Sequence, residues 1–336
     1  MNIMVVKSQT TISDRGFFGF AKILLRGAGQ VMFQGSAWTG LFFLVGIFWG
    51  AYSSHTPLVA WGALLGLLVS TFTGFILNMP DEEGEHGLWG FNGILVGCAF
   101  PTFLGNNIWM WLSLVLCAGL TTWVRTGMNN MMKQWKINSF TFPFVACTWI
   151  FLLAAHAMHG LAGIHEVHHA HHHLQHMQHI LFTGDVRYMA EVVLRGVSQV
   201  FLIDSWVAGA FMLLGLLVCS RWAFVWAVIG SAISSLTAFA LGAPMGSIAH
   251  GLYAFSAVLT AIALGSTFYR PCWRTALWAL LGIVTTVFVQ AAMNTIMPHG
   301  IATLTAPFCL TTWIFLLPML KIDKQSADHS SWHRRK

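Results

Sequence analysis

The stretch LRGAGQVMFQGSAWTGLFFLVGI, residues 25–47, recurs as LRGVSQVFLIDSWVAGAFMLLGL at residues 194–216. The positions that are identical in the two copies include the pairs Arg26/Arg195, Gln30/Gln199 and Gly40/Gly209. A match of this length within one chain indicates an internal duplication.

Two further matches follow in the same order. GLWGFNGILVG at 87–97 pairs with GLYAFSAVLTA at 251–261, and FTFPFVACTWIFLL at 140–153 pairs with LTAPFCLTTWIFLL at 304–317. Three matches in one order are not chance. The sequence therefore predicts that one structural unit occurs twice in the chain.

The hydropathy of the chain indicates that this repeated unit lies within a membrane. Of the 336 residues, 56% are hydrophobic and only 8% are charged, against about 25% in an ordinary soluble domain, and the mean hydropathy is +0.68. The runs without Asp, Glu, Lys or Arg are 27–80, 87–124, 137–165, 222–269 and 275–320. Each exceeds the roughly 20 residues that one membrane helix needs. This hydropathy excludes soluble enzymes, nucleic-acid binders and secreted disulfide scaffolds. The six dispersed cysteines are expected to be core residues.

The predicted fold is an all-α integral membrane protein with two repeats of five spans, each with a tilted or re-entrant segment. The segments interrupted by arginine lie at 17–34 and 188–203; the apolar ones lie at 37–52, 58–79, 87–101, 105–122, 139–157, 206–220, 222–242, 251–267, 275–291 and 303–320. An odd number of spans per repeat gives the repeats opposite orientations, with a central pore at their interface. The expected divisions are a tail at 1–16, a first repeat at 17–157, a His-rich linker at 158–187, a second repeat at 188–320 and a basic tail at 321–336.

The distribution of basic residues predicts the orientation. If the N-terminus is cytoplasmic, the loops on the outer side, at 53–57, 102–104, 243–250 and 292–302, contain no Lys or Arg. The inner loops and tail hold Arg125, Lys133, Lys136, Arg221, Arg270, Arg274, Lys321, Lys324, Arg334, Arg335 and Lys336. The positive-inside rule then places both termini in the cytoplasm and the His-rich linker outside an inner or plasma membrane. The net charge of +6 needs no nucleic-acid partner.

Polar groups within the apolar segments point to a path for a solute. The repeated motifs place Gln30, Gln199, Thr141 and Thr305 at membrane depth, where polar groups need protein or water partners. Pro143 and Pro307 predict a helix break beside each threonine. Apolar residues four apart predict flat walls: Phe91 with Leu95, Phe255 with Leu259, and Phe33, matched by Leu202, as an extension. Such a slot suits a small, flat, neutral molecule rich in N–H donors.

The motifs LRGxxQV, GLWGFN with its partner GLYAFS, and the paired TxPF boxes resemble those of the urea transporter family over roughly residues 20–320. The resemblance implies a homotrimer in which each protomer has its own pore. It assigns one amide-binding site to Gln30, Val31, Phe33, Phe91 and Leu95, and a second to Gln199, Val200, Phe255 and Leu259. Thr141 and Thr305 would line the constriction between these sites. Some members carry Glu where this chain has Gln199, so the filter here is formally neutral.

The expected function is passive, channel-like urea transport without a cofactor. Removing water from an amide without replacing its hydrogen bonds costs roughly 2–7 kcal/mol, so the path must offer acceptors. No acid in the charge-free runs offers a proton or sodium relay. The alternatives are an ammonia or short-amide pore, a divalent metal transporter that uses the His-rich loop, and a membrane enzyme, for which the spans show no repeated acid–base pair.

Ten of the 16 histidines lie at 156–179, and nine of these fall in the His-rich linker at 158–187. Spacings of four residues would allow chelation of Zn²⁺ or Ni²⁺ if this linker were helical. The candidates are His165, His168, His169, His172, His173 and His176. A solvated, pH-sensitive connector is the favoured interpretation, because such tracts bind metals adventitiously. No metal site is therefore assigned.

Overall fold

The computed structural model describes residues 16–158, 160–161, 186–298, 300–320 and 322. Within these residues all regular structure is helical, as predicted. The first half contains α1 (Gly16–Gln30), α2 (Ala37–Ser53), α3 (Pro57–Ile76), α4 (Asp81–Glu85), α5 (Phe91–Phe103), α6 (Ile108–Met132), η2 (Lys133–Trp135) and α7 (Phe142–Ala157). The second half contains α9 (Val186–Ser198), η4 (Gln199–Phe201), α10 (Trp206–Cys219), α11 (Arg221–Ala240), α12 (Met245–Ala249), α13 (Phe255–Ile262), η5 (Ala263–Thr267), α14 (Trp273–Ile296) and α15 (Ala306–Leu316). The predicted tails and most of the His-rich linker lie outside the described residues.

Every predicted apolar segment contains a helix, and local signals explain several helix starts. Pro57 occupies the first turn of α3, where its missing N–H leaves no bond unmade. Asn107, Ser205 and Ser220 cap α6, α10 and α11 with side-chain oxygens. The largest difference is α6, which runs about ten residues beyond the predicted 105–122 and so takes Arg125 and Asn129 into a helix.

In the described part of the chain, four helices are long and apolar enough to cross a membrane: α3, α6 continued to Trp135, α11 and α14. The bent pair formed by α9 with η4 and by α10, which meet at 77°, could count as a fifth. Five shorter apolar helices accompany them. The chain is thus an all-helical membrane protein, and the number of full crossings stays a prediction.

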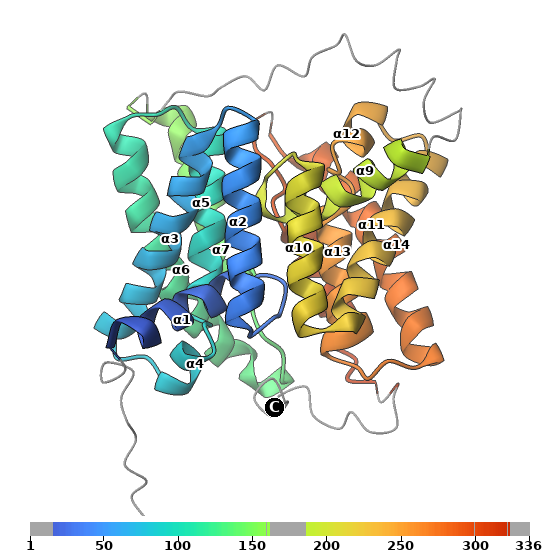
Figure 1. Cartoon of the computed structure of the whole chain (residues 1–336), viewed down its shortest axis with the longest axis horizontal. Helices are drawn as coiled ribbons and strands as arrows, with labels where there is room; N and C mark the ends of the chain where they lie inside the picture. Colours follow the sequence, from blue (N-terminus) through green and yellow to red (C-terminus); the bar gives the residue numbers. More distant parts are fainter. Residues whose placement is uncertain (1–15, 159, 162–185, 299, 321, 323–336) are drawn as a thin grey trace, which may run out of the picture.

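The two halves form two bundles that meet along α2 and α10 (Figure 1). The hydroxyl of Thr39 on α2 donates to the carbonyl oxygen of Gly215 on α10 at 2.8 Å. In the view of Figure 1, α1 and α4 lie at one end of the molecule and α9 and α12 at the opposite end.

The glycine that both repeats share at the start of their second helix has a packing reason. A Cβ on Gly40 would meet the carbonyl oxygen of Leu25, and a Cβ on Gly209 would meet that of Leu194. Leu25 and Leu194 are themselves matched positions of the two repeats. Each repeat therefore has the same close contact between this glycine and the backbone of the preceding helix, and only glycine leaves room for it.

Contacts between the halves are reciprocal. The indole N–H of Trp149 donates to the carbonyl oxygen of Ala302 at 2.9 Å, and that of Trp313 donates to the carbonyl oxygen of Asn138 at 3.0 Å. Both the donors and the acceptors are matched positions of the two repeats. These two bonds therefore exchange equivalent groups between the halves.

Candidate functional site

The two predicted constriction threonines meet where the halves join. Thr141 and Thr305 are the N-cap residues of α7 and α15, and each is 2% exposed. Their hydroxyl oxygens lie 2.7 Å apart, and Thr141 Oγ1 also lies 3.4 Å from Cys309 Sγ. The contact joins equivalent residues of the two repeats.

The predicted break inside a helix is wrong for both prolines. Pro143 and Pro307 lie in the first turn of α7 and α15, where proline displaces no intrahelical bond. The unusual backbone lies instead in the turns before the helices. The backbone is left-handed there, with φ of 51° at Phe140 and 50° at Leu304. Bulky residues rarely adopt this conformation, so surrounding contacts must hold it.

The turns after α1 and η4 show the same feature. Phe33 and Leu202, matched in the repeats, have φ of 64° and 59°. The ring of Phe33 packs edge-on against Phe140 and Phe308, with centroids 6.2 and 5.9 Å apart. Phe33 was predicted as a wall residue, whereas Phe140 and Phe308 were missed; the position of Phe140 directly before Thr141 could have indicated it.

A cavity of about 550 Å³ opens in the first half and reaches Thr141. The residues that line it are Gln30, Val31, Phe33, Glu83, Leu88, Phe91, Arg125, Asn129, Asn130, Lys133, Lys136, Ile137, Asn138, Ser139, Phe140, Thr141 and Phe308. The structure thus brings together five predicted residues: Gln30, Val31, Phe33, Phe91 and Thr141. The other six predicted residues are buried and do not line this cavity: Leu95, Gln199, Val200, Phe255, Leu259 and Thr305.

Gln30 offers the cavity an unused acceptor. Its side chain is 8% exposed, and its Nε2 donates to the carbonyl oxygen of His86 at 2.8 Å. Its Oε1 is buried without a protein partner, as is the hydroxyl of Ser139. Leaving such a group unpaired costs about 1–3 kcal/mol, so both atoms favour a hydrogen-bonding solute or water.

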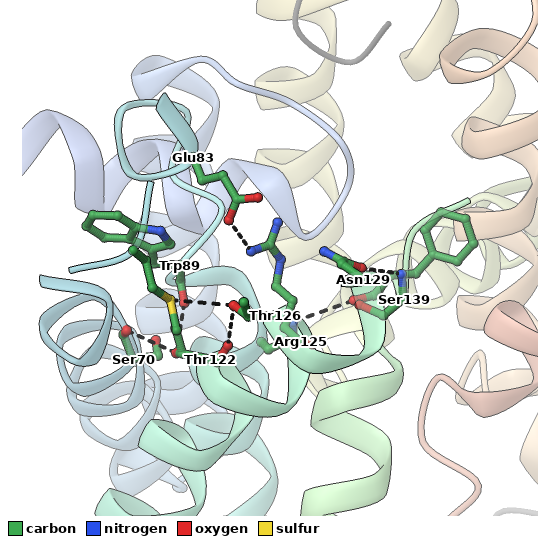
Figure 2. A network of polar contacts seen from close by, with 11 residues as sticks. Ser70, Glu83, Trp89, Thr122, Arg125, Thr126, Asn129 and Ser139 are labelled. Atoms are coloured by element: carbon green, nitrogen blue, oxygen red, sulfur yellow. Dashed lines mark hydrogen bonds and ion pairs between the residues drawn. The ribbon is translucent and has the colours of Figure 1, made fainter. Parts of the chain in front are cut away.

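Charged residues hold this side of the cavity together (Figure 2). Arg125 Nη1 lies 2.8 Å from Glu83 Oε2, and its guanidinium lies over the ring of Phe91 at 5.8 Å. Asn129, one turn later on α6, accepts from the backbone N–H of Ser139 at 2.8 Å. The sequence alone does not indicate these roles, because the charge of Arg125 predicts a loop residue.

We expect the substitution Glu83→Gln to lower the free energy of unfolding by about 1–3 kcal/mol. Arg125 is 7% exposed in its side chain, and breaking a buried pair leaves an uncompensated charge; the 28% exposure of Glu83 moderates the effect. Thermal unfolding in detergent measures it. The control is Glu191→Gln, because the partner of Glu191, Arg187, is 84% exposed. Equal shifts for both variants would contradict the prediction.

The corresponding region of the second half has different chemistry. Asp204 binds Arg195 Nη1 through Oδ1 at 3.1 Å and His250 Nδ1 through Oδ2 at 2.6 Å. The first repeat has Gly35 where the second has Asp204, and the second has Val289 where the first has Arg125. The two ends of the molecule are therefore not chemically equivalent.

No group of three or more metal-ligating side chains occurs among the residues that the structure describes. The candidate histidines 165, 168, 169, 172, 173 and 176 all lie outside them. The metal hypothesis for the linker therefore stays untested.

Comparison with known proteins covers nearly the whole chain. A family profile described as "Urea transporter" matches residues 21–319. Proteins named Urea transporter 1 from Ovis aries and Rattus norvegicus are 29% and 27% identical over 302 residues. Each alignment covers 89% of this chain and 77% of the relative.

Proposed function

The chain belongs to the urea transporter family, and from this premise we propose the route by which urea crosses it. The protein is an integral membrane transporter rather than an enzyme, and urea is the solute that it carries passively. The proposed path enters the cavity of the first half, passes Gln30, and reaches the Thr141–Thr305 contact between the halves. The observation that carries the proposal is this contact, because it brings together the hydroxyls of equivalent residues from the two halves.

The energetics of this path rest on exchange of hydrogen bonds. Urea loses water as it enters, and Gln30 Oε1, which has no protein partner, can accept one of its N–H groups. Further in, the two threonine hydroxyls bond each other. A solute must separate them, and it replaces the bond that they lose with its own N–H and C=O groups. Sites of similar strength in series allow exit as well as entry.

We propose that Phe33 and Phe91 form the apolar walls of the first site together with Val31. Phe33 and Phe91 line the cavity, and the guanidinium of Arg125 supports the ring of Phe91 from one side. By the repeat, Gln199, Val200, Phe255 and Leu259 form the corresponding site in the second half. Leu95, four residues after Phe91 on α5 and fully buried, belongs to the same wall in this proposal.

The proposed topology is two inverted repeats of five spans. The reciprocal bonds of Trp149 and Trp313 support a two-fold relation between the halves, because such an axis exchanges equivalent donors and acceptors. An odd number of spans puts this axis in the membrane plane. Both termini are then cytoplasmic and the His-rich linker lies outside. Cysteine labelling from each side of sealed vesicles tests this orientation.

We also propose a homotrimer, which rests on the family alone. Each protomer contains its own path in this proposal, so function does not require contact between paths. Mass photometry of the purified protein tests the assembly, and a monomer at all concentrations would exclude it.

The primary test is urea efflux from proteoliposomes measured by stopped-flow light scattering. Wild-type flux should exceed that of empty liposomes and should be independent of imposed proton or sodium gradients. Parallel measurements with ammonia, formamide and acetamide separate urea transport from the alternative of an ammonia or short-amide pore. Flux of Zn²⁺ that disappears when residues 162–185 are deleted would instead support the metal-transport alternative.

Gln30→Leu should lower urea flux by about 10-fold. The change keeps the approximate size of the side chain but removes the unpaired acceptor, together with the Nε2 donor to the carbonyl oxygen of His86. A lost hydrogen bond to the solute of about 1.4 kcal/mol corresponds to a factor of ten. The control is Gln134→Leu, because Gln134 is exposed and does not line the cavity. If both variants transport like the wild type, Gln30 does not bind the solute.

A further inference from the structure

The N-terminus of α7 lacks the cap that its sequence offers. An N-cap threonine usually accepts, through its hydroxyl, a hydrogen bond from a backbone N–H two or three residues later. Thr141 occupies this position but makes no such bond. Its hydroxyl lies instead against that of Thr305. The N–H of Phe144, one of the unpaired donors of the first helical turn, needs another acceptor in a buried region.

Asn92 on α5 supplies this acceptor. Its Oδ1 accepts from the N–H of Phe144 at 3.2 Å, and its Nδ2 lies 3.5 Å from the carbonyl oxygen of Phe140. One side chain therefore bridges the residues on both sides of Thr141. Asn92 is 1% exposed, so no bulk water competes for these contacts. It also directly follows Phe91, so the wall and the constriction are joined through one residue.

No equivalent bridge occurs among the residues of the second half that the structure describes. Ser256 occupies the position that corresponds to Asn92, and its hydroxyl is buried without a protein partner. A serine side chain is too short to span a turn as the Asn92 amide does. Thr305 also makes no side-chain cap. The cap supplied from another helix is thus a property of the first half, although both halves place a threonine at the constriction.

We propose that Asn92 is a positioning residue for the constriction. By capping α7 in place of Thr141, it keeps the Thr141 hydroxyl turned toward Thr305 and available to the solute. This inference rests on the proposed function, because the role of the Thr141 hydroxyl is part of that function. Without Asn92, the Thr141 hydroxyl at the N-cap is the usual acceptor for an N–H at the position of Phe144. A rotation about χ1 would then turn that hydroxyl away from the path.

The test is a double-mutant cycle in proteoliposomes with the wild type, Asn92→Ala, Thr141→Val and the double variant. Asn92→Ala should lower urea flux about 5- to 10-fold, as expected for a lost cap. In the Thr141→Val background, Asn92→Ala should have no further effect on flux, because the hydroxyl that it positions is already absent. If Asn92 only stabilised the fold, Asn92→Ala would lower flux by the same factor in the wild-type and Thr141→Val backgrounds. That result would overturn the proposal. So would an undiminished flux of Asn92→Ala.

Two more variants complete the design. Ser256→Ala, at the corresponding position of the second half, should transport like the wild type, because its hydroxyl bonds no protein group. If Asn92→Ala does not fold, Asn92→Ser, which places the second repeat's residue in the first, takes its place in the same cycle. Wild-type flux no faster than empty liposomes would reject the proposed function itself, whereas normal wild-type flux with equal factors in both backgrounds would reject only the role of Asn92.

Discussion

Replacing both constriction threonines, in Thr141→Val with Thr305→Val, is expected to reduce urea flux by about 10- to 100-fold. Valine has nearly the shape of threonine, so the width of the path changes little, but two hydroxyls are lost. Each lost hydrogen bond to the solute raises the barrier by roughly 1 kcal/mol, and a solute left with unpaired N–H groups in a dry constriction loses more. The two hydroxyls lie 2.7 Å apart and act at the same point of the path. We therefore expect the double variant to reduce urea flux more than either single variant does.

This double variant is interpretable because neither hydroxyl caps its own helix. Thr141 and Thr305 are N-cap residues without side-chain caps, so valine should leave α7 and α15 stable. The matched control is Thr285→Val, since Thr285 is on the exposed side of α14 and its hydroxyl bonds only the carbonyl of the preceding turn. Stopped-flow efflux and thermal unfolding should be measured on the same preparations. Full flux in the double variant would remove the threonines from the mechanism.

Gly97→Ala is expected to destabilise the fold by forcing α5 away from α3. Gly97 on α5 packs against Gly62 on α3, and an added Cβ would meet the Gly62 carbonyl oxygen and lie 2.7 Å from the Cα of Ala63. These neighbours are backbone atoms, which cannot move aside as a flexible side chain can. The helices must separate, and overpacking of this kind costs about 1–3 kcal/mol. Close approach at small residues is a main source of helix association in membranes.

The expected result is a lower unfolding midpoint in detergent together with reduced urea flux, because α5 begins with the proposed wall residue Phe91. Gly127→Ala is the matched control, since it makes the same change in a helix at a site with no atom within 4 Å of the new Cβ. Its midpoint should stay constant or rise, because alanine favours the helix. The same midpoint for both variants would contradict the packing argument.

The sequence predicted the elements of the fold well because the signals involved are local. Long runs without charge determine where helices can enter a membrane, and each predicted apolar segment contains a helix. The end of α6 was placed too early, because Arg125 was treated as a loop residue. Its charge is tolerated within the helix by Glu83 and the ring of Phe91, which come from other elements.

The candidate site was predicted only in part. Matching the repeats gave Gln30 and Thr141, which line the cavity, since corresponding positions can be compared without any coordinates. It did not give Phe140 and Phe308, because their importance depends on the left-handed turn at Phe140 and on packing between the halves. The role of Asn92 is likewise not visible in its motif.

The sequence by itself thus determined that this protein is a membrane protein whose two halves share repeated motifs, with few charges along its apolar segments. Hydropathy and self-similarity depend only on the order of residues along the chain, so they can be recognised without knowledge of tertiary contacts. Only the tertiary structure decided that Thr141 meets Thr305 and that Asn92 takes over the cap of α7. These facts depend on which surfaces of distant helices face each other. That choice is made by packing and hydrogen bonding between segments far apart in the chain, and no local pattern encodes it.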